Sequence, residues 1–190
     1  MAKPLVLVIG DSISMGYAPI LQELLADRAD IVHNPGNAAD SRNLLANLES
    51  YLAGLAPAVI TFNCGLHDIK LSRETGKLQV PHDEYPRNFE AIAARLAATA
   101  ARVMWVTTTP VHEANHTANK PFDRFSRDID ACNAAAAAIV ARRGFAVCDL
   151  HVAALAGPLD EILLPDGVHF TEPGYRLLAG VVLEKLRALL

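Results

Sequence analysis

A serine near the N-terminus stands where a nucleophile could be placed. The segment Gly10-Asp11-Ser12 directly follows a short apolar run and precedes a helical pattern. At such a strand-to-helix turn, the hydroxyl of Ser12 lies near the positive end of the helix and its N–H is free to donate to an oxyanion. The same position suits a helix cap, and either Ser12 or Ser14 could be that cap. The turn alone therefore leaves both interpretations open.

A histidine near the other end of the chain could be the base that such a serine needs. A serine hydroxyl must lose its proton to attack, and the imidazole that takes it needs an acceptor on Nδ1 to hold its tautomer. His169 and Asp166 can supply both groups. Gly167 allows a tight turn between them, and Thr171 can cap the helix that follows. An ordinary Asp-Gly turn with a loop histidine is the alternative interpretation.

Two further polar segments follow apolar runs. In the segment at residues 63–68, Asn-Cys-Gly-Leu-His-Asp, either His67 or Asn63 could donate a hydrogen bond to an oxyanion. Residues 34–41 form a turn-rich loop whose backbone N–H groups could point into the same crevice. Both segments are therefore candidates for the same site.

Short apolar runs and helical periods alternate along the chain and predict the elements that position these residues. Runs typical of buried strands occur at residues 5–9, 58–62, 103–107 and 145–148, with a weaker one near 31–32. Amphipathic helical periods lie between and after them. This alternation predicts a three-layer α/β/α fold with a five-stranded parallel sheet. Ligands bind beyond the carboxyl ends of such strands, so the polar residues that directly follow a strand are candidates for a site.

Other segments could wall a pocket at this edge of the sheet. The longest irregular stretches are residues 72–83 and 111–123. His112, which follows the fourth strand, could line the pocket or lie exposed.

Composition and charge exclude several classes of protein. The 190 residues are 52% hydrophobic and 20% charged, which is enough apolar material for the core of a single domain spanning residues 1–190. A net charge of −4 without a basic run argues against a nucleic-acid partner. Neither a signal-peptide core nor a membrane-length apolar stretch is present, so we expect a cytoplasmic protein without a membrane partner. Cys64, Cys132 and Cys148 form no C-x-x-C pair and are expected as buried free thiols.

Together, the four polar segments resemble the blocks of the SGNH hydrolases, the GDSL esterase and lipase family. The blocks occur in the family's order, from Gly10 to His169, and the resemblance implies a flavodoxin-like α/β fold. It also implies that Ser12 is the nucleophile, His169 the base and Asp166 the residue that orients the base. The implied activity is a serine esterase acting through an acyl-enzyme on small carboxylic esters, with short acyl or acetyl esters expected and no cofactor.

The oxyanion hole implied by this resemblance departs from the family in two places. The family combines the nucleophile's N–H with a glycine N–H from the second block and an asparagine side chain from the third. This chain has Ala39 at the glycine position, with Gly36 as a second choice, and His67 at the asparagine position. Ala39 can still donate its N–H if its φ is negative, and a neutral imidazole also has one N–H donor. We expect Asp11 and Asp68 to be structural acceptors that steady their loops, without a role as acid or base.

Two other function classes stay open. His67, Asp68, Asp166 and His169 could converge as ligands of a metal-dependent hydrolase, although this leaves the serine turn unexplained. The altered third block could instead mark a non-catalytic domain that binds carbohydrate or acyl ligands. The serine esterase is favoured because its set of serine, histidine and aspartate is complete, whereas the natural ester and the oligomeric state do not follow from the residues.

Overall fold

The computed structural model describes residues 2–190 and contains a five-stranded parallel sheet. The order of the strands is β2-β1-β3-β5-β7, which is the flavodoxin-like order. All five predicted strands are confirmed, with small shifts at their ends. Their bounds are β1 (Leu5–Ile9), β2 (Asp30–His33), β3 (Val59–Phe62), β5 (Arg102–Val106) and β7 (Ala146–Cys148).

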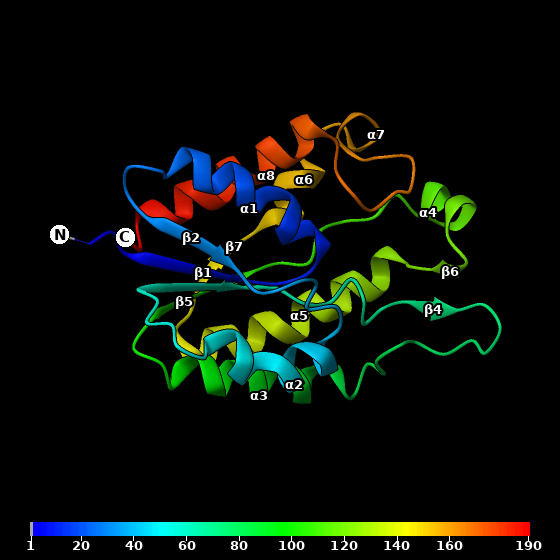
Figure 1. Cartoon of the computed structure of the whole chain (residues 1–190). Coiled ribbons are helices and arrows are strands. Elements are labelled where there is room, and N and C mark those ends of the chain that lie inside the picture. The colour runs from blue at the N-terminus through cyan, green and yellow to red at the C-terminus, as the bar shows by residue number, and fades with distance from the viewer. Residues whose placement is uncertain (1) are drawn as a thin grey trace.

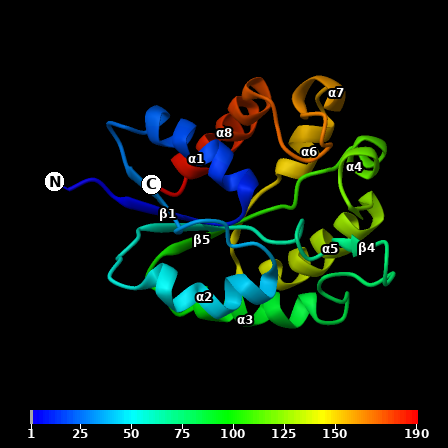
Figure 2. The same cartoon turned by 45° about the vertical axis from the view of Figure 1, so that its right-hand side comes forward.

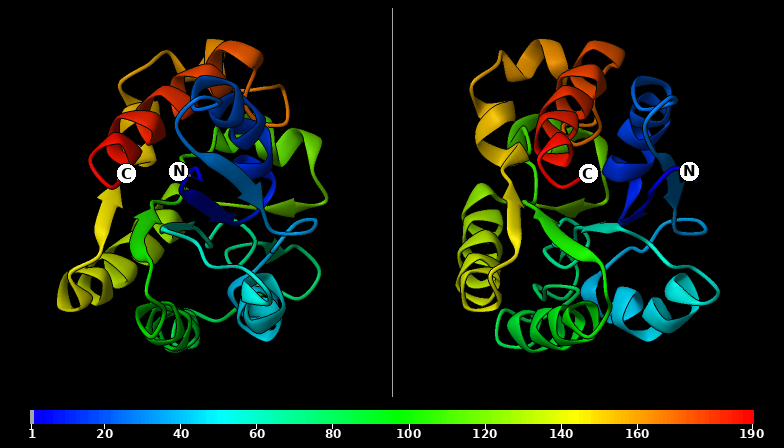
Figure 3. Two further views of the ribbon diagram at one scale, coloured as in Figure 1. Left: turned by 60° about the vertical axis from the view of Figure 1, so that its left-hand side comes forward. Right: turned by 90° about the vertical axis from the view of Figure 1, so that its left-hand side faces the viewer.

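Helices cover both faces of this sheet, which confirms the three-layer fold (Figures 1 and 3). α1, α6 and α8 pack together on one face, and α2, α3 and α5 pack on the other. No helix within residues 2–190 is long and apolar enough to cross a membrane. The bounds of these helices are α1 (Ser12–Leu24), α2 (Ser41–Leu52), α3 (Tyr85–Ala97), α5 (Ser126–Arg143), α6 (Leu150–Leu155) and α8 (Glu172–Arg187).

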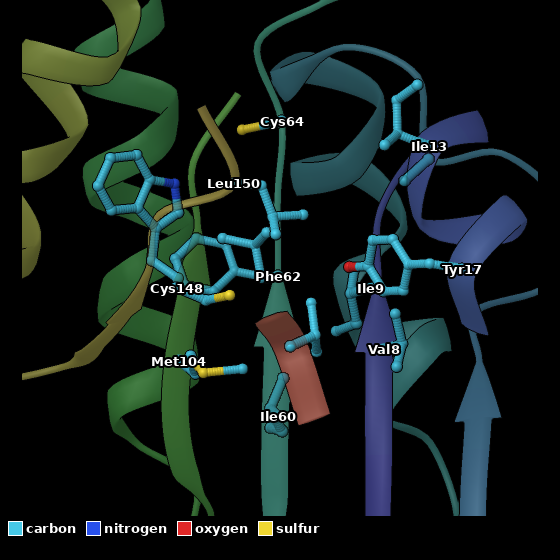
Figure 4. Packing of buried hydrophobic residues seen from close by; sticks show 14 of the residues in the cluster. Val8, Ile9, Ile13, Tyr17, Ile60, Phe62, Cys64, Met104, Cys148 and Leu150 are labelled. Atoms are coloured by element: carbon cyan, nitrogen blue, oxygen red, sulfur yellow. The ribbon is translucent and has the colours of Figure 1, made fainter. Parts of the chain in front are cut away.

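The core forms where the central strands meet the helices. Every residue of β3 is buried, and β1 is buried from its second residue onward. Because both faces of these strands are covered, their sequences are continuous apolar runs with no polar alternation. Figure 4 shows Phe62 from β3 and Tyr17 from α1 among the packed side chains. The three cysteines are buried free thiols, as predicted: Cys64, Cys132 and Cys148.

A small antiparallel sheet extends the fold beyond the carboxyl ends of the main strands. It consists of β4 (Leu71–Ser72) and β6 (Phe122–Asp123), and α4 (Glu113–Asn119) comes just before β6. Figures 1 and 2 show these elements together at one end of the molecule, opposite the two termini. They fall mostly in the stretches expected to be irregular, because elements this short carry no hydrophobic period. A further short helix, α7 (Leu159–Ile162), was also not predicted.

Candidate active site

Ser12 is the first residue of α1 and directly follows the turn after β1. Asp11 caps the helix, and its Oδ1 accepts a hydrogen bond from the Ile13 N–H at 3.0 Å. The interpretation in which Ser12 or Ser14 is the cap is therefore wrong. The Ser12 hydroxyl oxygen instead lies 2.9 Å from Nε2 of His169. The Ser12 N–H is in the first turn of the helix, where backbone donors have no intrahelical acceptor.

Hydrogen bonds tie the turn before Ser12 to the loop at residues 34–41. The Gly10 N–H donates to Oδ1 of Asn34 at 2.8 Å, and the Ala38 N–H donates to the Gly10 carbonyl at 2.9 Å. A Cβ at Gly10 would lie 1.9 Å from Oδ1 of Asn63, so any side chain here would force Asn63 to move. Both the N–H and the carbonyl of Gly10 are thus hydrogen-bonded to the loop at residues 34–41.

Asp166 holds the imidazole of His169 in one orientation. Its Oδ2 lies 2.6 Å from Nδ1 of His169, and its Oδ1 accepts from the backbone N–H groups of Val168 at 3.1 Å and His169 at 3.0 Å. Nζ of Lys120 lies 3.1 Å from the same Oδ2. Burial alone would raise the pKa of Asp166, but the hydrogen bonds from His169, Val168 and Lys120 hold it well below its usual range. The ionised carboxylate keeps the proton on Nδ1, so Nε2 is free to accept a proton from Ser12.

The loop between Asp166 and His169 depends on Gly167. Its φ is +70°, and a Cβ there would lie 2.5 Å from the carbonyl oxygen of His112. Thr171 caps α8 as predicted, because its Oγ1 accepts from the Gly174 N–H at 3.3 Å. His112 caps α4 by accepting from the Asn115 N–H at 3.2 Å and does not line the cavity beside Ser12.

A cavity of about 220 Å³ opens beside Ser12 and His169. Its walls combine apolar side chains with a histidine, an asparagine and three cations. The other lining residues are Asn37, Leu66, His67, Lys70, Lys120, Phe122, Arg124 and Val168.

His67, the expected oxyanion donor, lines this cavity together with Ser12. Burial, with the positive charges of Lys70 and Arg124, lowers the pKa of His67 to about 4. The ring is therefore neutral at neutral pH and has one N–H donor.

Asp68, the residue after His67, is fully buried. Both of its carboxylate oxygens accept from the backbone N–H of Ser41, at 3.0 and 3.1 Å. These hydrogen bonds tie the segment at residues 63–68 to the start of α2. Burial raises the pKa of Asp68 to about 7. Because its oxygens turn to Ser41, Asp68 does not converge with Asp166 and His169. Within residues 2–190, no three His, Cys, Asp or Glu side chains are placed to hold a metal ion.

Ala39 differs from its expected conformation. Its φ is +54°, in the left-handed region, and its N–H donates to Oδ1 of Asn37 at 2.8 Å. This conformation costs an alanine about 1–2 kcal/mol and is free for the glycine of the family pattern. The second choice, Gly36, has a φ of +68° and is exposed. Neither residue lines the cavity, whereas Asn37 does.

A second serine–histidine contact lies next to the first and was not predicted. Oγ of Ser14 is 2.7 Å from Nε2 of His33 and donates to the Asp11 carbonyl at 2.8 Å. Ser14 is completely buried, so an ester cannot reach its hydroxyl in this conformation. Burial lowers the pKa of His33. The contact joins β2 to α1.

The three cations of the cavity carry no signal in the sequence that marks them as site residues. Lys120 and Phe122 fall in the stretch expected to wall a pocket, but nothing in their spacing singled them out. Lys70 and Arg124 flank the two-residue strands of the small sheet. The pairing of those strands brings both residues to the same cavity, and strands this short cannot be recognised in the sequence.

Solved structures of hydrolases share this fold. The lipase/acylhydrolase from Enterococcus faecalis superposes with a TM-score of 0.83 at 19% identity, covering 97% of this chain and 96% of that one. An alpha/beta hydrolase enzyme from the metagenome of Lake Arreo, Spain, has a TM-score of 0.82 at 19% identity, with 100% and 98% covered. The acetyl xylan esterase Axe2 from Geobacillus stearothermophilus has a TM-score of 0.80 at 18% identity, with 96% and 94% covered.

The sequence itself identifies the family. No curated protein matches the chain. The GDSL-like Lipase/Acylhydrolase family, however, matches residues 8–177, which include Ser12, His67, Asp166 and His169. The chain therefore belongs to the GDSL-like lipase/acylhydrolase family and is a carboxylic ester hydrolase.

Proposed function

We propose that this hydrolase is a serine esterase in which Ser12 is the nucleophile, His169 the general base and Asp166 the residue that orients the base. The observation that carries the proposal is the continuous row of contacts across these three side chains. Oγ of Ser12 lies 2.9 Å from Nε2 of His169, and Nδ1 of His169 lies 2.6 Å from Oδ2 of Asp166. This is the arrangement that activates a serine hydroxyl.

Each group has a defined task in the proposed reaction. As Oγ of Ser12 attacks the ester carbonyl carbon, Nε2 of His169 takes the hydroxyl proton. The carboxylate of Asp166 stabilises the imidazolium that forms. His169 then gives the proton to the leaving alcohol oxygen, and the acyl group stays on Ser12. Water activated by His169 attacks this acyl-enzyme and releases the acid.

The oxyanion is bound by the Ser12 N–H and by the neutral ring of His67. Ser12 and His67 line the same cavity, which supports donation from both. The Ala39 N–H is a third donor only if the Asn37 side chain releases it, because the two are hydrogen-bonded at 2.8 Å. Gly36 remains the second choice for this position. One such donor contributes about 10²- to 10³-fold to kcat.

The proposed substrates are short-chain acyl or acetyl esters. A cavity of about 220 Å³ is smaller than the roughly 300–1,000 Å³ of sites that take drug-sized ligands. It can hold a short acyl group and leaves little room for a long chain.

A series of p-nitrophenyl esters from acetate to palmitate tests both parts of this proposal. We expect the highest kcat/KM for the shortest esters, and a preference for palmitate would overturn the short-chain assignment. Ser12→Ala should lose the activity and keep the melting temperature, whereas Ser50→Ala, at an exposed serine on α2, should change neither. Full activity in Ser12→Ala would overturn the choice of nucleophile.

A further inference from the structure

Two cations of the cavity beside Ser12 form no ion pair with any residue that the structure describes. Lys70, Lys120 and Arg124 all line the cavity, and Lys120 is paired with Asp166. Within residues 2–190, neither Lys70 nor Arg124 has a carboxylate oxygen within 4.0 Å. The negative charges of Asp11 and Asp166 act on Arg124 only from beyond that distance. The whole chain has a net charge of −4, so a general excess of basic residues does not explain this local positive charge.

Arg124 is placed where a charge without a partner is costly. Its residue surface is only 5% exposed, and its Nε donates to the Leu66 carbonyl at 2.5 Å. Its two terminal nitrogens have no acceptor among the described residues. Burial lowers the pKa of Arg124 to about 10, so the guanidinium remains charged at neutral pH. A buried cation of this kind is normally compensated by an anion.

The small sheet places the second cation beside the first. β4 and β6 pair Leu71 with Asp123 and Ser72 with Phe122, so one further step of this register puts Lys70 opposite Arg124. Like charges directly opposite each other destabilise a strand pair. Nζ of Lys70 and Cζ of Arg124 lie 5.3 and 5.1 Å from the centre of the Phe122 ring, which offers both only a weak cation–π contact.

We propose that the ester substrate carries an anionic group, a carboxylate or a phosphate, which binds between Lys70 and Arg124 in the cavity that holds Ser12. This inference rests on the proposed function, because it takes that cavity as the ester site. Arg124 presents terminal N–H groups that match the two oxygens of such an anion, and Lys70 adds a point charge. The anion can belong to the acyl part or to the alcohol part of the ester.

Two pairs of esters show whether the anion belongs to the acyl part or to the alcohol part of the substrate. The first pair is mono-4-nitrophenyl glutarate and its neutral methyl ester, which differ in a charge on the acyl side. The second is 4-carboxyphenyl butyrate and its neutral methyl ester, which differ in a charge on the alcohol side. In one pair we expect kcat/KM about 10- to 100-fold higher for the anion, after subtraction of the uncatalysed rate, and a smaller ratio in about 0.5 M NaCl. Equal kcat/KM within both pairs would overturn the inference while leaving the esterase intact.

A variant of Lys70 tests whether this residue causes the preference for anionic esters. Lys70→Met keeps the length of the side chain and removes its charge, so the ratio of anionic to neutral kcat/KM should fall about tenfold or more. Lys77→Met, at an exposed lysine near the same strand and outside the cavity, should keep the wild-type ratio. The assay is run at about pH 8, so that the loss of a neighbouring charge does not protonate His67. Equal losses for both esters in Lys70→Met would contradict the inference.

Binding without turnover separates this inference from the proposed function. Monomethyl glutarate or inorganic phosphate is titrated calorimetrically into Ser12→Ala protein, with and without Lys70→Met. Binding that weakens about tenfold or more on loss of Lys70 supports the anion site even if Ser12 proves not to be the nucleophile. No binding of either anion, together with equal rates for charged and neutral esters, would refute it.

Discussion

Replacing His67 by alanine removes the proposed oxyanion donor, which stands where the family pattern has asparagine. The ring lines the cavity with Ser12 and is neutral at neutral pH, because burial and its cationic neighbours lower its pKa to about 4. Loss of one oxyanion donor lowers kcat by about 10²- to 10³-fold, which is about 2.7–4 kcal/mol of transition-state stabilisation. KM should change little, because the oxyanion exists only in the transition state and the tetrahedral intermediate.

Two further substitutions at His67 separate hydrogen bonding from packing. His67→Asn restores an N–H donor on a shorter side chain and should recover part of kcat, whereas His67→Phe fills the space without a donor and should be as slow as alanine. The assay is steady-state hydrolysis of p-nitrophenyl acetate, with the melting temperature of each variant measured in parallel. If His67→Ala has the kcat of the wild type, backbone donors suffice and the reasoning about this ring is wrong.

Two other substitutions, Asp166→Asn and Ala39→Gly, and the pH dependence of stability give separate tests. Asp166→Asn removes the carboxylate that fixes the tautomer of His169, so kcat should fall by about 10⁴-fold with the fold retained, as circular dichroism can check. Ala39→Gly removes the strain of an alanine at a φ of +54°, so the melting temperature should hold or rise. The control Ala38→Gly removes a fully buried methyl group and should lower the melting temperature. Between about pH 6.5 and 4, the unfolded chain protonates His67 and the folded chain does not, so stability falls as the pH falls. The melting temperature of His67→Asn should therefore fall less steeply over that range, and parallel slopes would contradict the lowered pKa.

Much of the site could be predicted because its main groups lie next to strong local patterns. The strand before Ser12 is a continuous apolar run, and His169 follows Asp166 within one tight turn. Ser12 follows β1 at the carboxyl edge of the sheet, and the loop between α7 and α8 brings His169 to the same edge, so residues 157 positions apart meet there at 2.9 Å.

The remaining features of the site depend on contacts between distant residues, which no local sequence pattern reveals. The cap of α1 is Asp11, although serine suits a cap equally well, and only the chain's path decides between them. The left-handed conformation of Ala39 follows from the loop between β2 and α2 and contradicts the usual preference of alanine. Lys70 and Arg124 meet through strands of two residues each, which are too short for a hydrophobic period.

The most direct test of the central claim is the site of covalent labelling by a serine-directed phosphonate ester. Ser12, whose hydroxyl contacts His169, lines the cavity, whereas Ser14, which also contacts a histidine, is completely buried. Inactivated protein is digested and the adduct mapped by mass spectrometry, with Ser12→Ala as the control. If Ser12 is the nucleophile, we expect one adduct, on Ser12, formed in step with the loss of esterase activity and absent from the control. An adduct on Ser14 or any other serine that accompanies inactivation would contradict it.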